Sequence, residues 1–538
     1  MEAVSVKREK LLRLIKELVA IPSITEGPDE SRPGLLLAER FSKLAWFREH
    51  PECLQLVATP LEGSACALKS LVVRVDAEKS TKQTVLLISH YDVVATECYG
   101  ELASSAFDTE ALGEAFGADS DTLYGRGTMD MKCGAAVEAL LLEDFAENRK
   151  LFDVNIVAAF VGDEENASAG MRGVLPVLDK MRREGLEFLA AVNTEPGEAG
   201  KSGISGPMVF LGTLGKLMPA FYFRGRGAHV GNYYDGSSAL LSASQLVCWA
   251  EGNPHLADPL HGECPPSWIC LDMKSLRTSY SVTVPDRAYA YFNCFTTTNS
   301  PALVARQMQA AARWALSRAQ EQLTASYIAM PALGYQGSEY RPGPDKVFSL
   351  SELRELAEKR CGEGFKKELE QYISELPAGD MRERGIKTVD WIASRAQEEG
   401  PYVVCFFLSP WLPVRTDMTE DEKDRKAVAA ARAVRKECLE KYGLEMTEVE
   451  LFAGLCDLSY VGAKVSDEDI EALSENTPGW GTIYSIPLRE MQALGLPVIN
   501  LGASGEAPHR KEERLHLKYS LEILPELLAS LIRRLGEK

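Results

Sequence analysis

Four continuous apolar runs constrain the fold of this chain more than any other feature. They are LVVRV at 71–75, VLLIS at 85–89, VNIVAAFV at 154–161 and FLAAVNT at 188–194, and helical patterns such as GAAVEALLLEDFAE lie between them. Strands buried on both faces read as unbroken apolar runs, and intervening helices are typical of parallel crossovers. The pattern predicts an α/β fold with a mostly parallel central sheet flanked by helices.

The pattern changes from Lys216 onward. Alternating strands and amphipathic helices occur twice, which predicts a smaller α/β domain with an antiparallel sheet. Residues 330–400 are polar and rich in Glu and Lys, and we interpret them as an insertion. The segment PYVVCFFLS supplies a last strand, and a charged helix follows with Thr419 as its expected N-cap. We therefore expect a first domain of residues 1–214 and 419–538, interrupted by a smaller domain at 215–418.

Charge and composition exclude several functions. The 538 residues carry a net charge of −19, which repels phosphate backbones and anionic membranes. No run approaches the roughly 18 apolar residues that span a bilayer. The segment MEAVSVKREKLLRLIKELVAIPSI is charged and lacks the features of a signal peptide, and the 12 cysteines form no CxxC pair. We expect a cytoplasmic protein with reduced thiols that binds neither nucleic acid nor membrane.

Polar side chains follow the apolar runs. His90 and Asp92 end the strand in SHYDVV, although alone such a pair is more often an ordinary strand end. Asp130 lies in LYGRGTMDMKCGAA, in a glycine-rich turn before a helix that starts near Lys132. A loop aspartate of this kind is by itself more often an N-cap.

Further acids and a histidine follow later strands. The strand at 154–161 leads into Asp163, Glu164 and Glu165, and VNTEPG places Glu195 at another strand end. His509 lies in LGASGEAPHRKEER, after the strand at 497–501. Clustering acids at a buried strand end is costly unless cations or protons accompany them.

These groups are expected to converge at one edge of one sheet, where ligands gather in α/β folds. Imidazole nitrogens and carboxylate oxygens suit zinc, and a spare acid can act as a base. Two histidines and three or four carboxylates therefore indicate a two-metal hydrolytic centre.

The ordered set HYDVV, GRGTMDMKCG, DEE, EPG and a late histidine resembles the co-catalytic di-zinc metallopeptidase family, which includes aminoacylases, succinyl-diaminopimelate desuccinylase, peptidase T and glutamate carboxypeptidase. The segments YGRGTMDMKCG, YAYFNCFTTTNSP and LFAGLCDLSY are most similar to its arginine-utilisation (RocB-like) branch. The resemblance covers nearly the whole chain except 330–400. It implies a catalytic domain at 1–214 and 419–538 and an inserted lid or dimerisation domain at 215–418.

The resemblance also implies a ligand set. Asp130 would bridge two Zn²⁺ ions, which Co²⁺ or Mn²⁺ can replace. His90 and Glu195 would complete one site, and Glu165 and His509 the other.

Three further roles follow from the same resemblance. Glu164 would be the general base that moves a proton from the attacking water to the leaving amine. Asp92 would support His90. A cis peptide bond would join Asp130 to Met131.

In the smaller domain, FRGRGAHVG resembles the family's lid motif, which places His229 as the residue that stabilises the oxyanion, often across a dimer interface. The less favoured alternative is that His229 is an ordinary turn histidine after a strand. The family's lid carries an aspartate and an arginine where VPDRAYAYFNCF has Asn293 and Phe295, so substrate binding through a free carboxylate is in doubt. Candidates to compensate are Arg224, Arg277 and Arg287.

We therefore expect a zinc-dependent hydrolase that cleaves an amide bond in a small peptide or an N-acyl amino acid. Arginine or amino-acid catabolism is implied only by the RocB-like resemblance, and a homodimer through the lid domain by the lid resemblance. The alternative function is a non-catalytic, metal-bound regulatory or scaffold protein.

Overall fold

The chain folds into two compact units. The computed structural model describes residues 7–61, 67–198, 206–262, 264–337, 339–344, 346–416, 418–419, 421–451 and 456–537. Unit 1 comprises Met1–Leu214, Pro413–Lys464 and Pro487–Lys538, and unit 2 comprises Gly215–Leu412 and Val465–Ile486. Unit 1 is thus assembled from three separate stretches of sequence.

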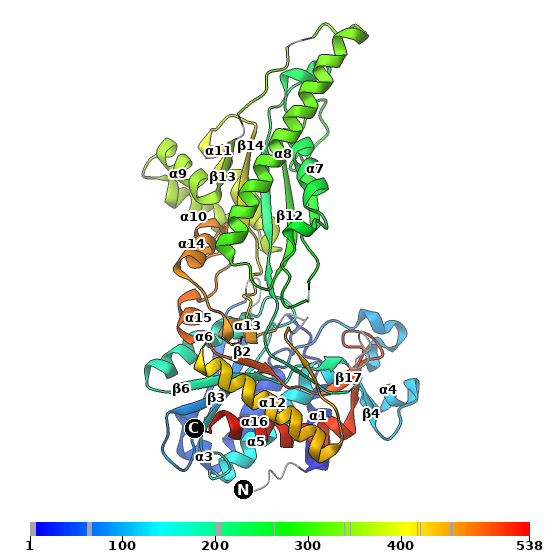
Figure 1. Ribbon diagram of the computed structural model, residues 1–538, viewed down its shortest axis with the longest axis vertical. Helices are drawn as coiled ribbons and strands as arrows, with labels where there is room; N and C mark the ends of the chain where they lie inside the picture. Colours follow the sequence, from blue (N-terminus) through cyan, green and yellow to red (C-terminus); the bar gives the residue numbers. More distant parts are fainter. Residues whose placement is uncertain are drawn as a thin grey trace. The chain divides into compact units, whose positions relative to one another are not determined.

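The main sheet of unit 1 is mixed, with a parallel centre (Figure 1). Its strands run in the order β1 (Leu54–Thr59), β2 (Leu68–Val75), β5 (Asn155–Val161), β3 (Gln83–His90), β6 (Glu187–Asn193), β16 (Val498–Asn500), β8 (Met208–Phe210) and β15 (Thr447–Val449). The four central strands β5, β3, β6 and β16 are parallel neighbours, whereas β1, β2 and β5 pair antiparallel. The predicted α/β fold with a mostly parallel centre is confirmed.

Helices cover both faces of this sheet. A large apolar core lies between the sheet and α1 (Arg8–Val19), α2 (Arg32–Ser42), α3 (Ala45–Glu49), α5 (Cys133–Glu147), α12 (Glu422–Tyr442) and α16 (Leu524–Leu535). On the other face lie α6 (Ala169–Arg183), α13 (Leu458–Gly462) and α15 (Leu488–Leu494) (Figure 1). In α1 the buried residues Leu11, Leu14, Ile15, Leu18 and Val19 recur at helical spacing and form one apolar stripe.

A second, small sheet completes unit 1. It contains β4 (Thr122–Tyr124), β18 (Arg514–His516), β17 (Ser504–Glu506) and β7 (Gly197–Glu198), beside α4 (Thr109–Phe116). The antiparallel strands β17 and β18 form a hairpin, and its loop carries His509.

Unit 2 is built on a largely antiparallel sheet, as predicted. The strand order is β11 (Ile269–Ser275), β12 (Arg287–Thr296), β10 (Pro219–Arg224), β14 (Tyr402–Phe407) and β13 (Lys346–Ser349), and β9 (Gly215–Leu217) also pairs with β12. Only β13 and β14 pair in parallel among these strands. The long α8 (Pro301–Ala329) and α7 (Ala239–Ala250) pack against the sheet.

The region at 330–400 adds the strand β13 and the helices α9 (Leu350–Cys361), α10 (Phe365–Glu375) and α11 (Met381–Ala396). Leu353, Phe365 and Val389 from these helices are buried in one core with Tyr222 and Val404 of the sheet. The strand was not expected from the sequence, because KVFS is short and has only two apolar residues. The region is therefore part of the packed core of unit 2.

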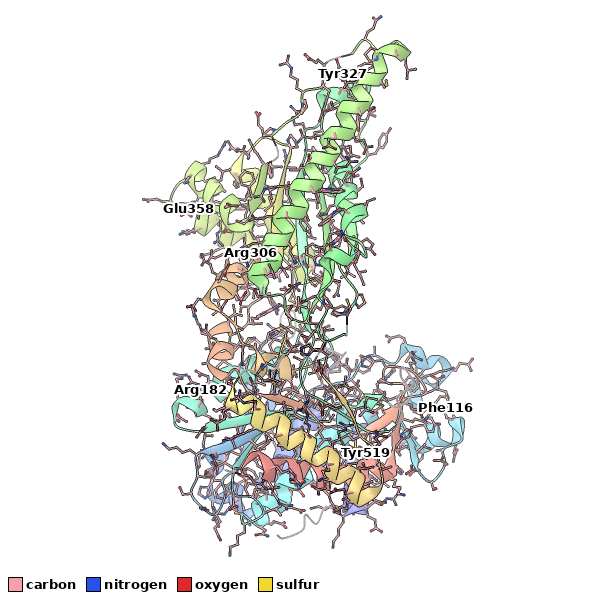
Figure 2. The ribbon with its side chains drawn as sticks, in the orientation of Figure 1. Phe116, Arg182, Arg306, Tyr327, Glu358 and Tyr519 are labelled. Carbon is pink, nitrogen blue, oxygen red and sulfur yellow. The ribbon has the colours of Figure 1, made fainter. Side chains whose placement is uncertain are left out.

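The helix α14 (Asp467–Asn476) returns to unit 2 late in the chain. Arg306, near the start of α8, pairs with Glu468 of α14 at 2.6 Å. Tyr327 lies near the other end of α8 (Figure 2). Its ring packs edge-to-face against that of Tyr234. These contacts join elements that are far apart in the sequence of unit 2.

Two smaller observations complete the fold. The helix expected to start after Thr419 begins at Glu422, and its N-cap is Asp421, whose carboxylate accepts the N–H of Asp424 at 2.9 Å. The prediction of Thr419 as the cap was therefore wrong, because Asp421 is the residue that meets the first turn.

In the described part of the chain, no helix has the length and apolar character needed to cross a membrane.

Candidate metal centre

Candidate ligands stand at the carboxyl ends of three adjacent parallel strands. His90 is the last residue of β3, Glu165 follows β5, and Glu195 follows β6. Because β5, β3 and β6 are parallel neighbours, their carboxyl ends meet at one edge of the sheet. The convergence expected from the sequence is present in the structure.

Asp130 reaches this edge from a tight turn before α5. Gly127 has a positive φ of 80°, and a Cβ atom there would lie 2.6 Å from Val93 Cγ1. Only glycine accommodates both the backbone angle and the close approach. The peptide bond between Asp130 and Met131 is cis, as expected.

The carboxylate of Asp130 lies between two histidines. Its Oδ1 is 3.2 Å from His90 Nε2, and its Oδ2 is 3.1 Å from His509 Nε2. Glu195 Oε1 lies 3.3 Å from the same His90 nitrogen, and Glu165 Oε1 lies 3.1 Å from the same His509 nitrogen. The side chains thus form two groups of three that share Asp130.

Glu164 lies close to the first group without joining it. Its Oε2 is 4.0 Å from His90 Nε2, and its side chain is 8% exposed. Burial raises the pKa of Glu164 well above its ordinary value. A carboxyl group that readily holds a proton beside the other acids is suited to proton transfer.

Asp92 organises the backbone beside the acids. Its carboxylate accepts the main-chain N–H groups of Glu164 at 3.2 Å and Glu165 at 3.3 Å, and the Thr25 hydroxyl at 2.9 Å. His90 Nδ1 lies 3.1 Å from the main-chain oxygen of Asp92 and 3.5 Å from its carboxylate. Asp92 therefore holds the loop after β5 as well as the His90 ring.

Glu513 holds the turn that carries Asp130. Its Oε1 accepts main-chain N–H groups from Gly127 at 2.9 Å and from Met129 and Asp130 at 3.3 Å each. Its Oε2 pairs with the buried guanidinium of Arg126. Since Glu513 and His509 belong to the same hairpin, this hairpin both carries one candidate ligand and fixes the position of another.

The electrostatics of the site favour cations. Burial raises the pKa of Glu195 to about 7. The carboxylates of Asp130 and Glu165, each 3.1 Å from His509 Nε2, raise the pKa of His509 to about 10. Burial acts to raise the pKa of Asp130, but hydrogen bonds from His509 and His90 outweigh it and lower that pKa. These shifts arise because several carboxyl groups are buried close together, where a positive charge beside them stabilises their ionised forms.

The donor set fits divalent metals. Ligand atoms of His90, Asp130 and Glu165 all lie within 4.8 Å of one another. Glu165 Oε1 is buried and has no hydrogen-bond partner of ordinary geometry among the described residues, although His509 Nε2 is nearby. A buried, orphaned carboxylate oxygen that faces an imidazole nitrogen suits a cation between them. His90, Asp130 and Glu195 would hold one ion, and Asp130, Glu165 and His509 the other.

The remaining predicted residues belong to unit 2. His229 is exposed, and its Nδ1 accepts the N–H of Gly231 at 3.1 Å. Asn293 is buried on β12, and Phe295 is half-buried. The three candidate arginines all have partners within unit 2: Arg224 lies 3.6 Å from Asp286, Arg277 donates to Thr283 O at 2.7 Å, and Arg287 pairs with Asp390 at 2.7 Å. Their roles toward a substrate stay predictions.

Sequence reasoning missed several residues that support the site. Glu513 follows His509 by four positions in a charged loop, and nothing in that pattern marks it as buried. Thr25 likewise gave no signal. Glu138 left a weak one, because it is a lone acid in the apolar stretch GAAVEALLL.

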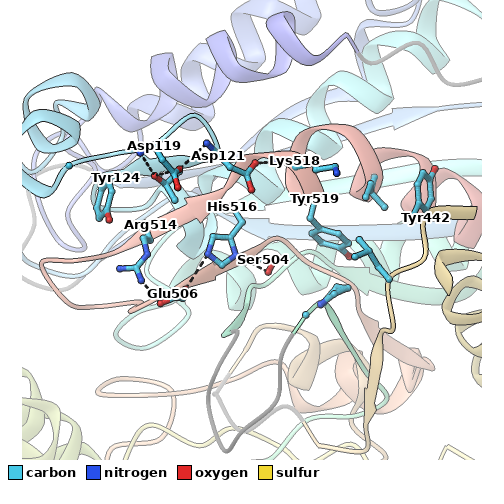
Figure 3. A pocket seen from close by; sticks show the side chains of 16 residues that line it. Asp119, Asp121, Tyr124, Tyr442, Ser504, Glu506, Arg514, His516, Lys518 and Tyr519 are labelled. Atoms are coloured by element: carbon cyan, nitrogen blue, oxygen red, sulfur yellow. Dashed lines mark hydrogen bonds and ion pairs between the residues drawn. The ribbon is translucent and has the colours of Figure 1, made fainter.

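A separate cavity of about 790 Å³ lies beside the small sheet, where residues of β4, β17 and β18 line it (Figure 3). Glu506 in its wall pairs with Arg514 and lies 3.3 Å from His516. None of the candidate metal ligands lines it. The cavity is therefore distinct from the metal centre.

A family profile matches residues 86–534, and the chain belongs to peptidase family M20/M25/M40. It is 30% identical to the uncharacterised protein YqjN of Bacillus subtilis, over 98% of this chain and 96% of that one. It is 26% identical to protein RocB of the same organism, over 97% and 94% of the two chains. In structure it is similar to the M20 family metallo-carboxypeptidase Sso-CP2 from Sulfolobus solfataricus, with a TM-score of 0.53 at 13% identity over 98% of this chain and 100% of that one.

Proposed function

We propose that this protein is a metal-dependent hydrolase that cleaves an amide bond in a small peptide or an N-acyl amino acid. The observation that carries the proposal is the Asp130 carboxylate, whose two oxygens face two separate groups of histidine and glutamate. Membership of a peptidase family supports the hydrolytic reaction. A place in arginine or amino-acid catabolism is proposed from the resemblance of the sequence segments to the arginine-utilisation branch of the family.

Two divalent cations, which we propose to be Zn²⁺ with Co²⁺ or Mn²⁺ as substitutes, would polarise the scissile carbonyl and acidify a water molecule. Asp130 would contribute one carboxylate oxygen toward each ion. The carboxylate of Asp92 keeps Glu164 in place because it accepts the main-chain N–H of Glu164. Glu164 takes a proton from the attacking water on a carboxylate oxygen and delivers it to the leaving nitrogen.

His229 of unit 2 is proposed to donate a hydrogen bond to the oxyanion, from the lid that unit 2 would form. We also propose that two copies of the chain associate through this lid, as the lid motif implies. The eleven described cysteines are free thiols, which supports a reducing, cytoplasmic location.

The decisive experiment is a screen of dipeptides and N-acyl amino acids with Zn²⁺, Co²⁺ and Mn²⁺, in which release of a free amine is measured. Turnover that requires metal and disappears in Glu164→Ala, with metal still bound, supports the hydrolase. Metal binding without turnover of any substrate would favour the alternative, a metal-bound regulatory or scaffold protein.

A further inference from the structure

Glu138 is a fully buried carboxylate in the middle of α5. Burying a carboxylate is costly unless hydrogen bonds or cations compensate for the lost water. Among the described residues no lysine, arginine or histidine forms an ion pair with Glu138. Its hydrogen bonds come from two hydroxyl groups: Ser89 Oγ donates to Oε2 at 3.1 Å, and Thr194 Oγ1 donates to Oε1 at 2.8 Å.

Both hydroxyl groups belong to residues that directly precede candidate metal ligands. Ser89 precedes His90 at the end of β3, and Thr194 precedes Glu195 after β6. Along extended backbone, successive side chains point to opposite sides. Glu138 therefore accepts a hydrogen bond from each strand end on the side opposite the candidate ligand.

The helix that carries Glu138 also follows the third ligand. Asp130 lies just before α5, which begins at Cys133. Near that start, a Cβ atom on Gly134 would lie 2.3 Å from Thr194 Oγ1, so the absence of a side chain lets the helix press against Thr194. Glu138 is four residues further on and faces the same side of the helix. One carboxyl group thus joins the two strand ends that lead into His90 and Glu195 to the helix that follows Asp130.

The other group of ligands has different supports. Asp92 holds the main-chain N–H of Glu165, and His509 is carried by the β17–β18 hairpin. The hydrogen bonds that Glu138 accepts from Ser89 and Thr194 reach neither of these segments. Glu138 therefore acts on one half of the centre.

We propose that Glu138 is a positioning residue for the metal site of His90, Asp130 and Glu195, and that it strengthens metal binding there without affecting the site of Glu165 and His509. Its carboxylate fixes the two strand ends at the separation that the ligands need. This role presupposes the proposed two-metal centre.

The test measures metal binding, independently of any substrate. The full-length protein is stripped of metal, and the affinities for Zn²⁺ are measured by competition with a chelator. Glu138→Gln keeps the shape of the side chain and replaces one of the two oxygens that accept the Ser89 and Thr194 hydroxyl groups with an amide nitrogen. We expect one of two affinities to fall by about 10- to 100-fold, the usual effect of removing a group that supports a ligand.

Ligand variants assign the affected site. In a His509→Ala background, which keeps the site of His90, Glu138→Gln should still weaken Zn²⁺ binding by about 10-fold or more. In a His90→Ala background, it should change the remaining affinity by less than about twofold. Equal effects in both backgrounds, or none in the first, would overturn the proposal.

Glu143→Gln is a matched control on the same helix. Glu143 is also buried, but it pairs with Lys10 at 2.8 Å and Arg40 at 2.9 Å on the surface side of α5. This variant should lower stability and leave both Zn²⁺ affinities unchanged. If Glu138→Gln does not fold, the double variant Ser89→Ala and Thr194→Val removes the same two hydrogen bonds and should show the same selective loss. Failure of the wild type to bind any Zn²⁺ would overturn the proposed metal centre itself, and this role with it.

Discussion

Glu513 accepts the main-chain N–H of Asp130 at 3.3 Å, so a residue near the end of the chain sets the position of the carboxylate at the middle of the site. The same side chain pairs with Arg126, and both groups are inaccessible to solvent. Removing one partner of a buried pair leaves an uncompensated charge. The consequences should therefore reach both folding and metal binding.

Replacement of Glu513 by leucine should lower the free energy of unfolding by about 3–5 kcal/mol, because Arg126 loses its buried partner. It should also weaken binding of both metals, since both sites share Asp130. Denaturant unfolding and Zn²⁺ competition measure the two effects. Glu512→Gln, next in the sequence and half-buried, is the control and should change neither.

Removal of metal should lower the thermal stability of the protein. A ligand that binds only the folded state stabilises it by about 2.7 kcal/mol at a concentration 100 times its Kd. The melting temperature should fall on addition of a chelator and recover with Zn²⁺, Co²⁺ or Mn²⁺. An unchanged melting temperature across these conditions would contradict a metal centre held by His90, Asp130 and Glu195.

Glu164→Ala should abolish turnover while both metals stay bound. Turnover should fall because general acid–base groups contribute about 10²- to 10⁴-fold to a rate. The metals should stay bound because Glu164 lies 4.0 Å from His90 and outside both groups of candidate ligands. The kcat of the best substrate from the screen and the metal content per chain should be measured together. Loss of metal in parallel with activity would show that Glu164 is a ligand rather than a base.

His90, the last residue of β3, and Tyr91, which follows it, should behave differently. His90→Ala should remove one metal and the activity. Tyr91 points away from the site and donates a hydrogen bond to Lys69 O at 2.7 Å, so Tyr91→Phe should cost only about 1 kcal/mol of stability. Its metal content and activity should match the wild type. A similar loss in both variants would mean that His90 acts through folding alone.

Glu30 predicts a pH dependence of stability. Burial, helped by the carboxylates of Asp92 and Asp163, raises the pKa of Glu30 to about 8, above its ordinary value of 4.5. Between these values the folded protein holds a proton that the unfolded chain has lost, so this group makes stability fall as pH rises.

Glu30→Gln should therefore flatten the decline in unfolding free energy between about pH 5 and about pH 8 in the metal-free protein. Denaturant titrations at several pH values measure the slope. Asp29→Asn, which alters an exposed pair with Arg32, should keep the slope of the wild type. A wild-type slope in Glu30→Gln would mean that Glu30 is ionised throughout this range.

The sequence predicted those features that depend on local pattern and on sheet topology. Unbroken apolar runs indicated parallel strands, and parallel strands bring residues such as His90 and Glu195 to one edge whatever the details of packing. Glu513 and Glu138 could not be found in this way, since their roles depend on contacts with segments that are distant in sequence. The cap at Asp421 was missed because both Thr419 and Asp421 suit an N-cap, and the tertiary position of the helix decides between them.

The position of His509 has a consequence for how the protein is made. Four candidate ligands lie within the first 195 residues, whereas the fifth follows the whole of Gly215–Leu412. During synthesis the nascent chain can present His90, Asp130 and Glu195 long before His509 and Glu513 leave the ribosome. The candidate centre therefore has its full ligand set only after almost the entire chain has been translated, and a product truncated between Glu195 and His509 lacks the fifth candidate ligand.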